Sequence, residues 1–186
     1  YAENGLAGIF SPQRAEHEFH TLLVNVPNAV AGNVVINELM ADNFSTAFDE
    51  FGESNDWIEF YNTTSNVLNL SGLYLSDDIF NVTKWQFPVG SIIEPDGYLI
   101  VWADMDTLQN VLHASFKLGA SGESVFFTNG TSVYDQINFP ALNPDQVYAR
   151  CPDAGTFTYS TPTFAEANNC YLEANELNGE FVRIYP

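Results

Sequence analysis

The sequence of 186 residues has few positive charges. Five Lys and Arg stand against 24 Asp and Glu, which gives a formal net charge of -19 at pH 7. The cations are scattered along the chain at Arg14, Lys84, Lys117, Arg150 and Arg183. Nucleic acids and anionic lipids bind clusters of basic side chains, so we predict neither as a partner. Calcium ions and cationic protein surfaces are better partners for a chain of this net charge. The alternative is that the acidic surface only keeps the protein soluble.

Long apolar runs are missing too. The longest one spans only residues 99–103, whereas a membrane-spanning helix needs roughly 18 uncharged apolar residues or more. We therefore predict no insertion into a membrane. The chain opens at Tyr1 without the succession of basic, apolar and small residues that marks a signal peptide. We expect an export signal to have been removed or to lie upstream.

Sequence patterns that mark common catalytic sites are absent as well. The chain has no Gly-Lys-Ser or Gly-Lys-Thr phosphate loop, no Gly-x-Ser-x-Gly elbow, no His-Glu-x-x-His pair and no Cys-x-x-Cys pair. Two acids that meet across a cleft leave no such pattern, so a carboxylate pair for glycoside hydrolysis stays open. We predict no catalytic residue, no cofactor and no enzymatic activity.

Three short segments carry possible metal ligands. The segment Glu16-His17-Glu18-Phe19-His20 offers nitrogen and oxygen donors. The acidic turns Asp104-Met105-Asp106 and Ser76-Asp77-Asp78 carry carboxylates of the type that bind calcium. Neither turn continues into a complete calcium-loop pattern, and solvated turns explain them more simply. We predict no metal site and keep calcium as an alternative.

The chain has two cysteines, Cys151 and Cys170, each flanked by turn-forming residues. Their number and placement predict one disulfide bridge and an oxidising compartment. Closing this loop would stabilise the fold by roughly 3 kcal/mol, chiefly by restricting the unfolded chain. Two buried thiols remain the alternative.

What the sequence does contain is a series of short apolar runs separated by Asn, Asp, Gly, Ser and Pro. This pattern predicts strands joined by turns, about nine of them at roughly ten-residue spacing. An all-β, antiparallel, immunoglobulin-like sandwich needs about this number. The predicted strands are residues 34–40, 57–61, 68–75, 84–87, 91–93, 98–103, 124–128, 132–139 and 147–150.

Several residues have specific structural roles in this prediction. We expect Asn37 and Glu38 to hydrogen-bond loops or neighbouring backbone donors rather than to catalyse a reaction. Gly72, inside a predicted strand, suggests a bulge or a close approach of another backbone. Lys117 is expected to pair with an acidic neighbour, either Glu123 or Glu59. A helix of two turns is possible over residues 106–113.

The ends of the chain differ from the middle. We expect residues 1–32 to be an N-terminal extension or linker, 33–168 a sandwich domain, and 169–186 a C-terminal linker. The apolar stretch 22–26 fits a strand or the end of a short helix, and the alternatives stay open. Residues 27–28 and 31–33 have the composition of a linker.

Nine stretches, taken in order, carry a family resemblance. They are residues 36–43, 56–62, 70–78, 85–88, 97–104, 113–118, 122–125, 148–153 and 161–168. Together they resemble the lamin tail domain family in its bacterial extracellular form and cover about residues 34–168. Phe164 and Glu166 stand where the family more usually has Pro and Gly, which concerns the shape of one loop.

The resemblance implies a non-catalytic interaction or structural module of an exported bacterial protein. It would act outside the cell or at the cell surface and contact a protein or a cell-surface polymer. The alternative is a calcium-dependent carbohydrate-binding or accessory domain of an extracellular hydrolase, which the acidic loops and many aromatic residues favour. Residues 181–186 (FVRIYP) also resemble the entry to the C-terminal sorting domain of proteins exported by the type IX system.

Overall fold

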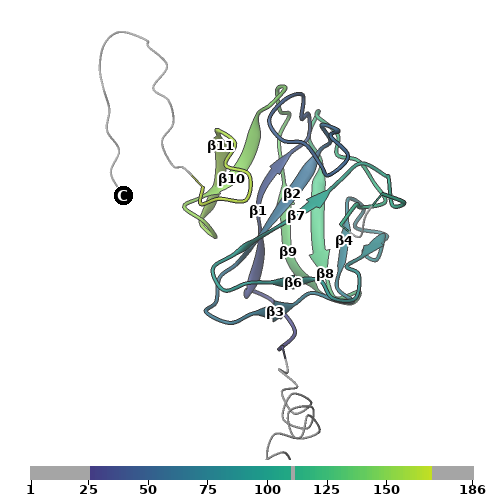
Figure 1. Ribbon diagram of the computed structural model, residues 1–186, viewed down its shortest axis with the longest axis vertical. Coiled ribbons are helices and arrows are strands. Elements are labelled where there is room, and N and C mark those ends of the chain that lie inside the picture. Colours follow the sequence, from purple (N-terminus) through teal and green to yellow (C-terminus); the bar gives the residue numbers. More distant parts are fainter. Residues whose placement is uncertain (1–25, 110–111, 169–186) are drawn as a thin grey trace, which may run out of the picture.

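A computed structural model describes residues 26–109 and 112–168 (Figure 1). These residues form eleven strands and no helix. The strands are β1 (Val34–Met40), β2 (Trp57–Asn62), β3 (Leu68–Asn69), β4 (Tyr74–Ser76), β5 (Trp85–Gln86), β6 (Ile92–Ile93), β7 (Tyr98–Trp102), β8 (Ser124–Thr128), β9 (Val133–Asn138), β10 (Val147–Cys151) and β11 (Thr156–Ser160).

The strands make two main antiparallel sheets. One has five strands in the order β11-β10-β1-β2-β7, and the other has four in the order β5-β4-β8-β9. A third pair, β3 and β6, lies at the lower end of the sandwich in Figure 1. The arrangement confirms the predicted all-β, immunoglobulin-like sandwich.

The main core lies between the two sheets and follows from alternation along the strands. Successive side chains of a strand point to opposite faces, so every second residue faces the other sheet. Phe60 on β2 packs against Phe127 on β8, with ring centroids 5.1 Å apart. Buried residues that share this core include Ile36, Leu39, Ile58, Phe60, Leu75, Phe87, Val101, Val125, Phe127 and Ile137.

Most predicted strands are present, and two differences stand out. The predicted strand 68–75 is split, because Gly72 has a φ of 85° and the Leu73 N–H donates to the Leu70 carbonyl to form a turn. Gly72 therefore lies in a turn and not in a bulge. The strand β11 was not predicted, although Phe157 and Tyr159 alternate with polar residues along it; none of its five residues is fully buried.

The possible helix over 106–113 is wrong for the described residues of that segment. The Trp102 N–H donates to the Leu112 carbonyl, and the Ala114 N–H donates to the Trp102 carbonyl. These bonds bring His113 back alongside the end of β7 as an isolated bridge. Among the described residues of this segment, Gln109 donates its N–H to the Asp106 carbonyl in a single turn, and His113 then lies parallel to the end of β7.

Part of the expected linker before β1 lies against the sandwich. Asn69 donates its N–H to the Pro27 carbonyl, and Ala29 donates its own to the Asn69 carbonyl. Ala29 is buried in the main core. The rest of the predicted extension, residues 1–25, and the predicted C-terminal linker, 169–186, lie outside the described residues. Within the described part, no helix is long and apolar enough to span a membrane.

Replacing Phe127 by Ala is expected to lower the free energy of unfolding by about 3–5 kcal/mol, because the ring is fully buried between the two sheets. Chemical denaturation followed by tryptophan fluorescence measures this loss. Phe80→Ala is the matched control, because Phe80 is 97% exposed and the same truncation should change stability by less than about 0.5 kcal/mol. Equal losses in the two variants would contradict the packing described here.

Candidate functional site

The five-stranded sheet is covered on its outer face as well as its inner one. Met40, Trp57 and Trp102 form a second apolar cluster there, together with Val147 and Ala149. Phe164 covers this cluster, with its ring centroid 5.1 Å from that of Trp57 and 5.6 Å from that of Trp102. Trp57 is therefore buried although it points away from Ile58 and the main core.

Next to this cluster, the same outer face buries acidic side chains. Glu38 on β1 and Glu59 on β2 are opposite each other in the sheet, and both are fully buried. A register shift between Ile36 and Glu38 makes a bulge at Asn37. The Asn37 side-chain amide donates to Glu59 Oε1 at 3.1 Å and to Asp153 Oδ1 at 2.9 Å. The bulge thus points an amide at two carboxylates.

These carboxylates bind the segment 161–168, which carries Phe164. The Thr163 N–H donates to Glu38 Oε1 at 3.0 Å, and the Ala165 N–H donates to Glu59 Oε2 at 2.7 Å. The Asn168 N–H donates to an oxygen of Asp153 at 3.0 Å. The predicted role of Asn37 and Glu38 in holding loops and backbone donors is therefore confirmed.

Burial disfavours the ionised forms of Glu38 and Glu59. It raises the pKa of Glu38 to about 7, against the lowering effect of the Thr163 hydrogen bonds. It raises the pKa of Glu59 to about 8, and the neighbouring Glu38 charge adds to the rise. Arg150 does not offset this cost, because its guanidinium donates to both carboxylate oxygens of Asp135 on β9.

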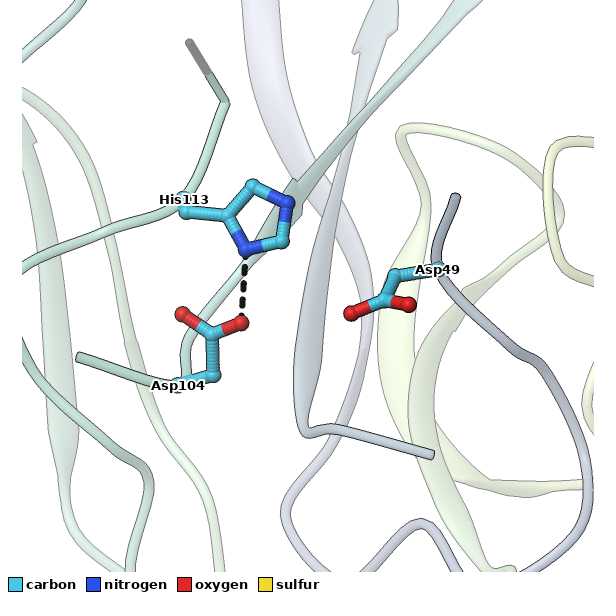
Figure 2. A group of neighbouring side chains, drawn as sticks. All are labelled: Asp49, Asp104 and His113. Carbon is cyan, nitrogen blue, oxygen red and sulfur yellow. Dashed lines mark hydrogen bonds and ion pairs between the residues drawn. The ribbon is translucent and has the colours of Figure 1, made fainter. Parts of the chain in front are cut away.

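A second polar group joins two loops at the other end of β2. Asp49 lies in the loop between β1 and β2, whereas Asp104 and His113 lie in the segment after β7 (Figure 2). All three residues are buried, and one ligand atom from each lies within 4.8 Å of the other two. His113 Nδ1 is 2.6 Å from Asp104 Oδ2, and its Nε2 is 3.3 Å from Glu50 Oε1.

Asp49 is fixed by hydrogen bonds from its own loop. Its Oδ1 accepts the N–H groups of Phe51 at 2.8 Å and Glu53 at 2.9 Å, and its Oδ2 accepts the Asn55 amide at 3.2 Å. Burial raises the pKa of Asp49, but these bonds and the nearby His113 outweigh burial and lower it below its ordinary value. Asp49 is thus held as a carboxylate facing Asp104 and His113.

The loops that carry these residues also expose apolar side chains. Phe48 and Phe51 are 59% and 57% exposed, and Met105 is 62% exposed. We call this region the loop end and define it as residues 42–55 and 104–109. The two loops are adjacent, because Gln109 Nε2 donates to Glu53 Oε2 at 2.9 Å. The loop end lies opposite the β3–β6 pair (Figure 1).

The structure places the acidic and basic residues predicted from the sequence in different surroundings. Asp104 lies in the buried group with His113, but Asp77 in the other acidic turn pairs with Lys84 at 2.6 Å. Lys117 is exposed and pairs with neither Glu123 nor Glu59, so those two expected partners are wrong; its charge acts instead on Asp56, where it opposes the rise in pKa that burial causes. Its expected partners bind elsewhere: Glu123 accepts the Gly119 N–H, and Glu59 accepts Asn37 and Ala165.

Some expectations fall on residues that the structure does not describe. His17 and His20, like the whole segment 16–20, lie outside the described residues. Cys170 lies beyond residue 168, so the Cys151–Cys170 bridge stays a prediction. Conversely, sequence reasoning missed Asp49 as a partner of His113, because 64 residues separate the two and no spacing pattern connects them.

Comparison with models of known protein families assigns the chain to one family. The model of the lamin tail domain family matches residues 27–148, which is more than half of the sequence. The chain belongs to the lamin tail domain family. No curated protein and no solved structure is significantly similar to it.

The match explains much of the architecture. The lamin tail domain is an immunoglobulin-like fold and generally a non-catalytic protein-interaction module. The matched residues include Asn37, Glu38 and Glu59, and also the Asp49–Asp104–His113 group. The match ends inside β10, whereas β11 and the segment 161–168 continue the same sheet and cover its outer face. In this lamin tail domain the acids of the outer face hold the segment 161–168, which lies beyond the matched residues.

The raised pKa values of Glu38 and Glu59 predict a pH dependence of stability. Both groups bind protons more strongly in the folded than in the unfolded chain, so the folded state loses stability as pH rises from about 5 to about 8. The loss should reach a few kcal/mol, since a tenfold change in proton affinity is worth about 1.4 kcal/mol. Urea denaturation at several pH values measures it.

Glu38→Gln is the informative variant for this prediction. Its amide oxygen can still accept the Thr163 N–H, and its NH₂ group can donate to the Thr163 hydroxyl, which itself reaches Asn168. The variant should therefore fold, and its stability should fall less between pH 5 and pH 8 than that of the parent. An exposed control, Glu94→Gln, should leave the pH profile unchanged. An unaltered profile in Glu38→Gln would refute the assignment.

Proposed function

We propose that this lamin tail domain is a non-catalytic interaction module of an exported, cell-surface or secreted protein, and that its loop end contacts a protein partner. The observation that carries the proposal is the cluster of exposed apolar side chains on two adjacent loops. Besides Phe48, Phe51 and Met105, the same loops expose Phe44 at 76% and Leu108 at 95%. Contiguous exposed apolar side chains on a soluble domain mark interaction sites.

The charge around these side chains favours a basic partner. The same loops also carry carboxylates outside the buried group, at Asp42, Glu50, Glu53 and Asp106. The described residues of the two loops contain no Lys or Arg. A partner surface that combines apolar groups with Lys or Arg would complement both features, and opposite charges speed association and select partners.

The uses of the buried acids also support a module without catalysis. Glu38, Glu59 and Asp153 accept hydrogen bonds that attach the segment 161–168 to the sheet. A carboxylate that acts in hydrolysis has to face a substrate instead. These acids therefore contribute to the domain structure and leave the loops as the contact surface.

Site-directed photo-crosslinking in the parent protein tests the proposed contact surface. A photoreactive residue at position 48 should give protein adducts on the producing cells, and the same residue at position 89 should not. Val89 is the matched control, because it is 98% exposed but lies outside the loop end. The position-48 adducts should weaken as salt increases, because screening reduces attraction between charged surfaces. No adducts at position 48, or equal adducts at both positions, would overturn the proposal.

The calcium-dependent carbohydrate-binding alternative has a separate test. Of the two acidic turns that suggested it, 76–78 is occupied internally by the Lys84 ion pair and by the Ser76 hydroxyl bond to the Asn81 carbonyl. Retention on polysaccharide columns that depends on added calcium would favour the alternative over a protein contact.

Export also predicts the Cys151–Cys170 bridge. We expect the native chain to react with no thiol reagent until it is reduced, with both cysteines found in one disulfide-linked peptide by mass spectrometry. The free energy of unfolding of Cys170→Ser should be about 3 kcal/mol lower than that of the oxidised parent, because the unfolded chain of the variant is less restricted. After reduction of the disulfide, the parent should have the same free energy of unfolding as the variant. Free thiols in the secreted protein would contradict the bridge.

A further inference from the structure

We propose that Asp49, Asp104 and His113 form a binding site for one divalent transition-metal ion of the zinc class. The site would provide one imidazole nitrogen and two carboxylate oxygens from two separate loops (Figure 2). This proposal goes beyond the interaction function and does not depend on it.

The distances among the ligand atoms suit a single ion. Three atoms that are all within 4.8 Å of one another can be no more than about 2.8 Å from a common centre. Zinc bonds to His nitrogen and carboxylate oxygen are about 2.0–2.2 Å long. Small side-chain movements of less than about 1 Å therefore bring all three atoms within bonding range.

The donor types select the class of metal. Calcium takes six to eight oxygen ligands, and a nitrogen donor does not suit it. Zinc and its neighbours accept imidazole together with carboxylates, and three protein ligands leave a fourth position for water. The set Asp49, Asp104 and His113 therefore favours a zinc-class ion over the calcium suggested by the acidic turns alone.

The surroundings hold the ligands in place from outside the group. Asp49 Oδ1 accepts the N–H groups of Phe51 and Glu53, and Asp104 Oδ1 accepts the Asp106 N–H at 2.9 Å. Such outer bonds orient metal ligands in known sites. Asp104 Oδ2 and the His113 ring remain on the side that faces Asp49.

One buried polar atom in the loop end has no hydrogen-bond partner. Gln109 Oε1 is buried and unpaired, whereas its Nε2 donates to Glu53. Buried polar atoms without partners are rare and costly, and a bound water commonly supplies the missing donor.

The histidine is the least ambiguous part of the site. The His113 side chain is completely buried, and its two nitrogens are 2.6 Å from Asp104 and 3.3 Å from Glu50. A metal on Nδ1 would replace the proton that now lies between the ring and Asp104, while Glu50 could still accept a hydrogen bond from Nε2. Glu50 would then fix the orientation of the ring without being a ligand.

Calorimetric titration of the full-length chain with zinc tests the proposal. The chain should carry the background substitutions His17→Ala and His20→Ala, which remove the other histidines, and should first be treated with a chelator. We expect one zinc ion per chain, and a melting temperature higher by roughly 5–10 °C at a free zinc concentration of 100 times the dissociation constant. Cobalt in place of zinc should give the visible absorption of a four-coordinate site.

Two substitutions and one control locate the ion. Asp49→Asn and His113→Gln should each weaken zinc binding by at least about tenfold. Asp106→Asn removes one negative charge from the loop end and leaves the backbone N–H that Asp104 accepts; the Asp106 side chain hydrogen-bonds only Leu108 among the described residues, so this variant should bind zinc within about twofold of the parent. If His113→Gln fails to fold, Asp49→Asn decides alone, because its amide oxygen can still accept the Phe51 and Glu53 N–H groups.

Several results would overturn the site. Absence of zinc and cobalt binding in the His17→Ala, His20→Ala background is one, and unchanged affinity in Asp49→Asn is another. Calcium binding of equal affinity at the same residues would reject the metal class. Failure of this site would leave the loop-end contact intact, because the crosslinking test at position 48 does not depend on a metal.

Discussion

The fold depends on one bulge in β1. Asn37 interrupts the pairing between Ile36 and Glu38, so the residues on its two sides meet different partners. Before the bulge, the Ile36 N–H donates to Asp135 and the Ile36 carbonyl accepts from Arg150, which joins β1 to the second sheet. After it, Glu38 pairs with Glu59 on the outer face. A β-bulge of this type redirects a strand and re-aims a side chain.

This geometry explains why charged groups are buried in a domain of this size. The Arg150–Asp135 pair closes the edge where the two sheets meet, with two hydrogen bonds of 3.0 Å to a single carboxylate. The acids Glu38 and Glu59 lie on the opposite side of the strand and have amide donors as partners instead of a cation. Hydrogen bonding to backbone N–H groups offsets part of the cost of burial. The outer face is thus more sensitive to pH than the core.

Much of the fold could be predicted from the sequence, because the information is local. Strands such as β2 and β8 are short apolar runs bounded by turn residues, and the Asn129-Gly130 turn that joins β8 to β9 has the residues that such turns require. The split of the predicted strand 68–75 depends on the backbone conformation of Gly72, which no periodic pattern encodes. The strand β11 forms a hairpin with β10, and its Phe157 and Tyr159 alternate with polar residues, so its pattern was present in the sequence but overlooked.

The candidate site was predictable only in part. Asn37 and Glu38 stood out because polar residues at the start of an apolar strand need partners. Asp104 stood out because it lies in an acidic turn. Its neighbours Asp49 and His113 could not be predicted, because they are 55 and 9 residues away in sequence and no spacing pattern connects them to it. Long-range proximity of this kind depends on the register of β1, β2 and β7, which places two loops beside each other at one end of the sandwich.

The cover provided by Phe164 affects the order in which the domain can be completed. The segment that carries Phe164 follows β1, β2 and β7 in the chain, so Trp57 and Trp102 face water until this segment docks on the sheet. Docking also removes Glu38 and Glu59 from the water that favours their ionised forms. A polypeptide cut after β10 would therefore expose an aromatic surface that tends to bind other molecules.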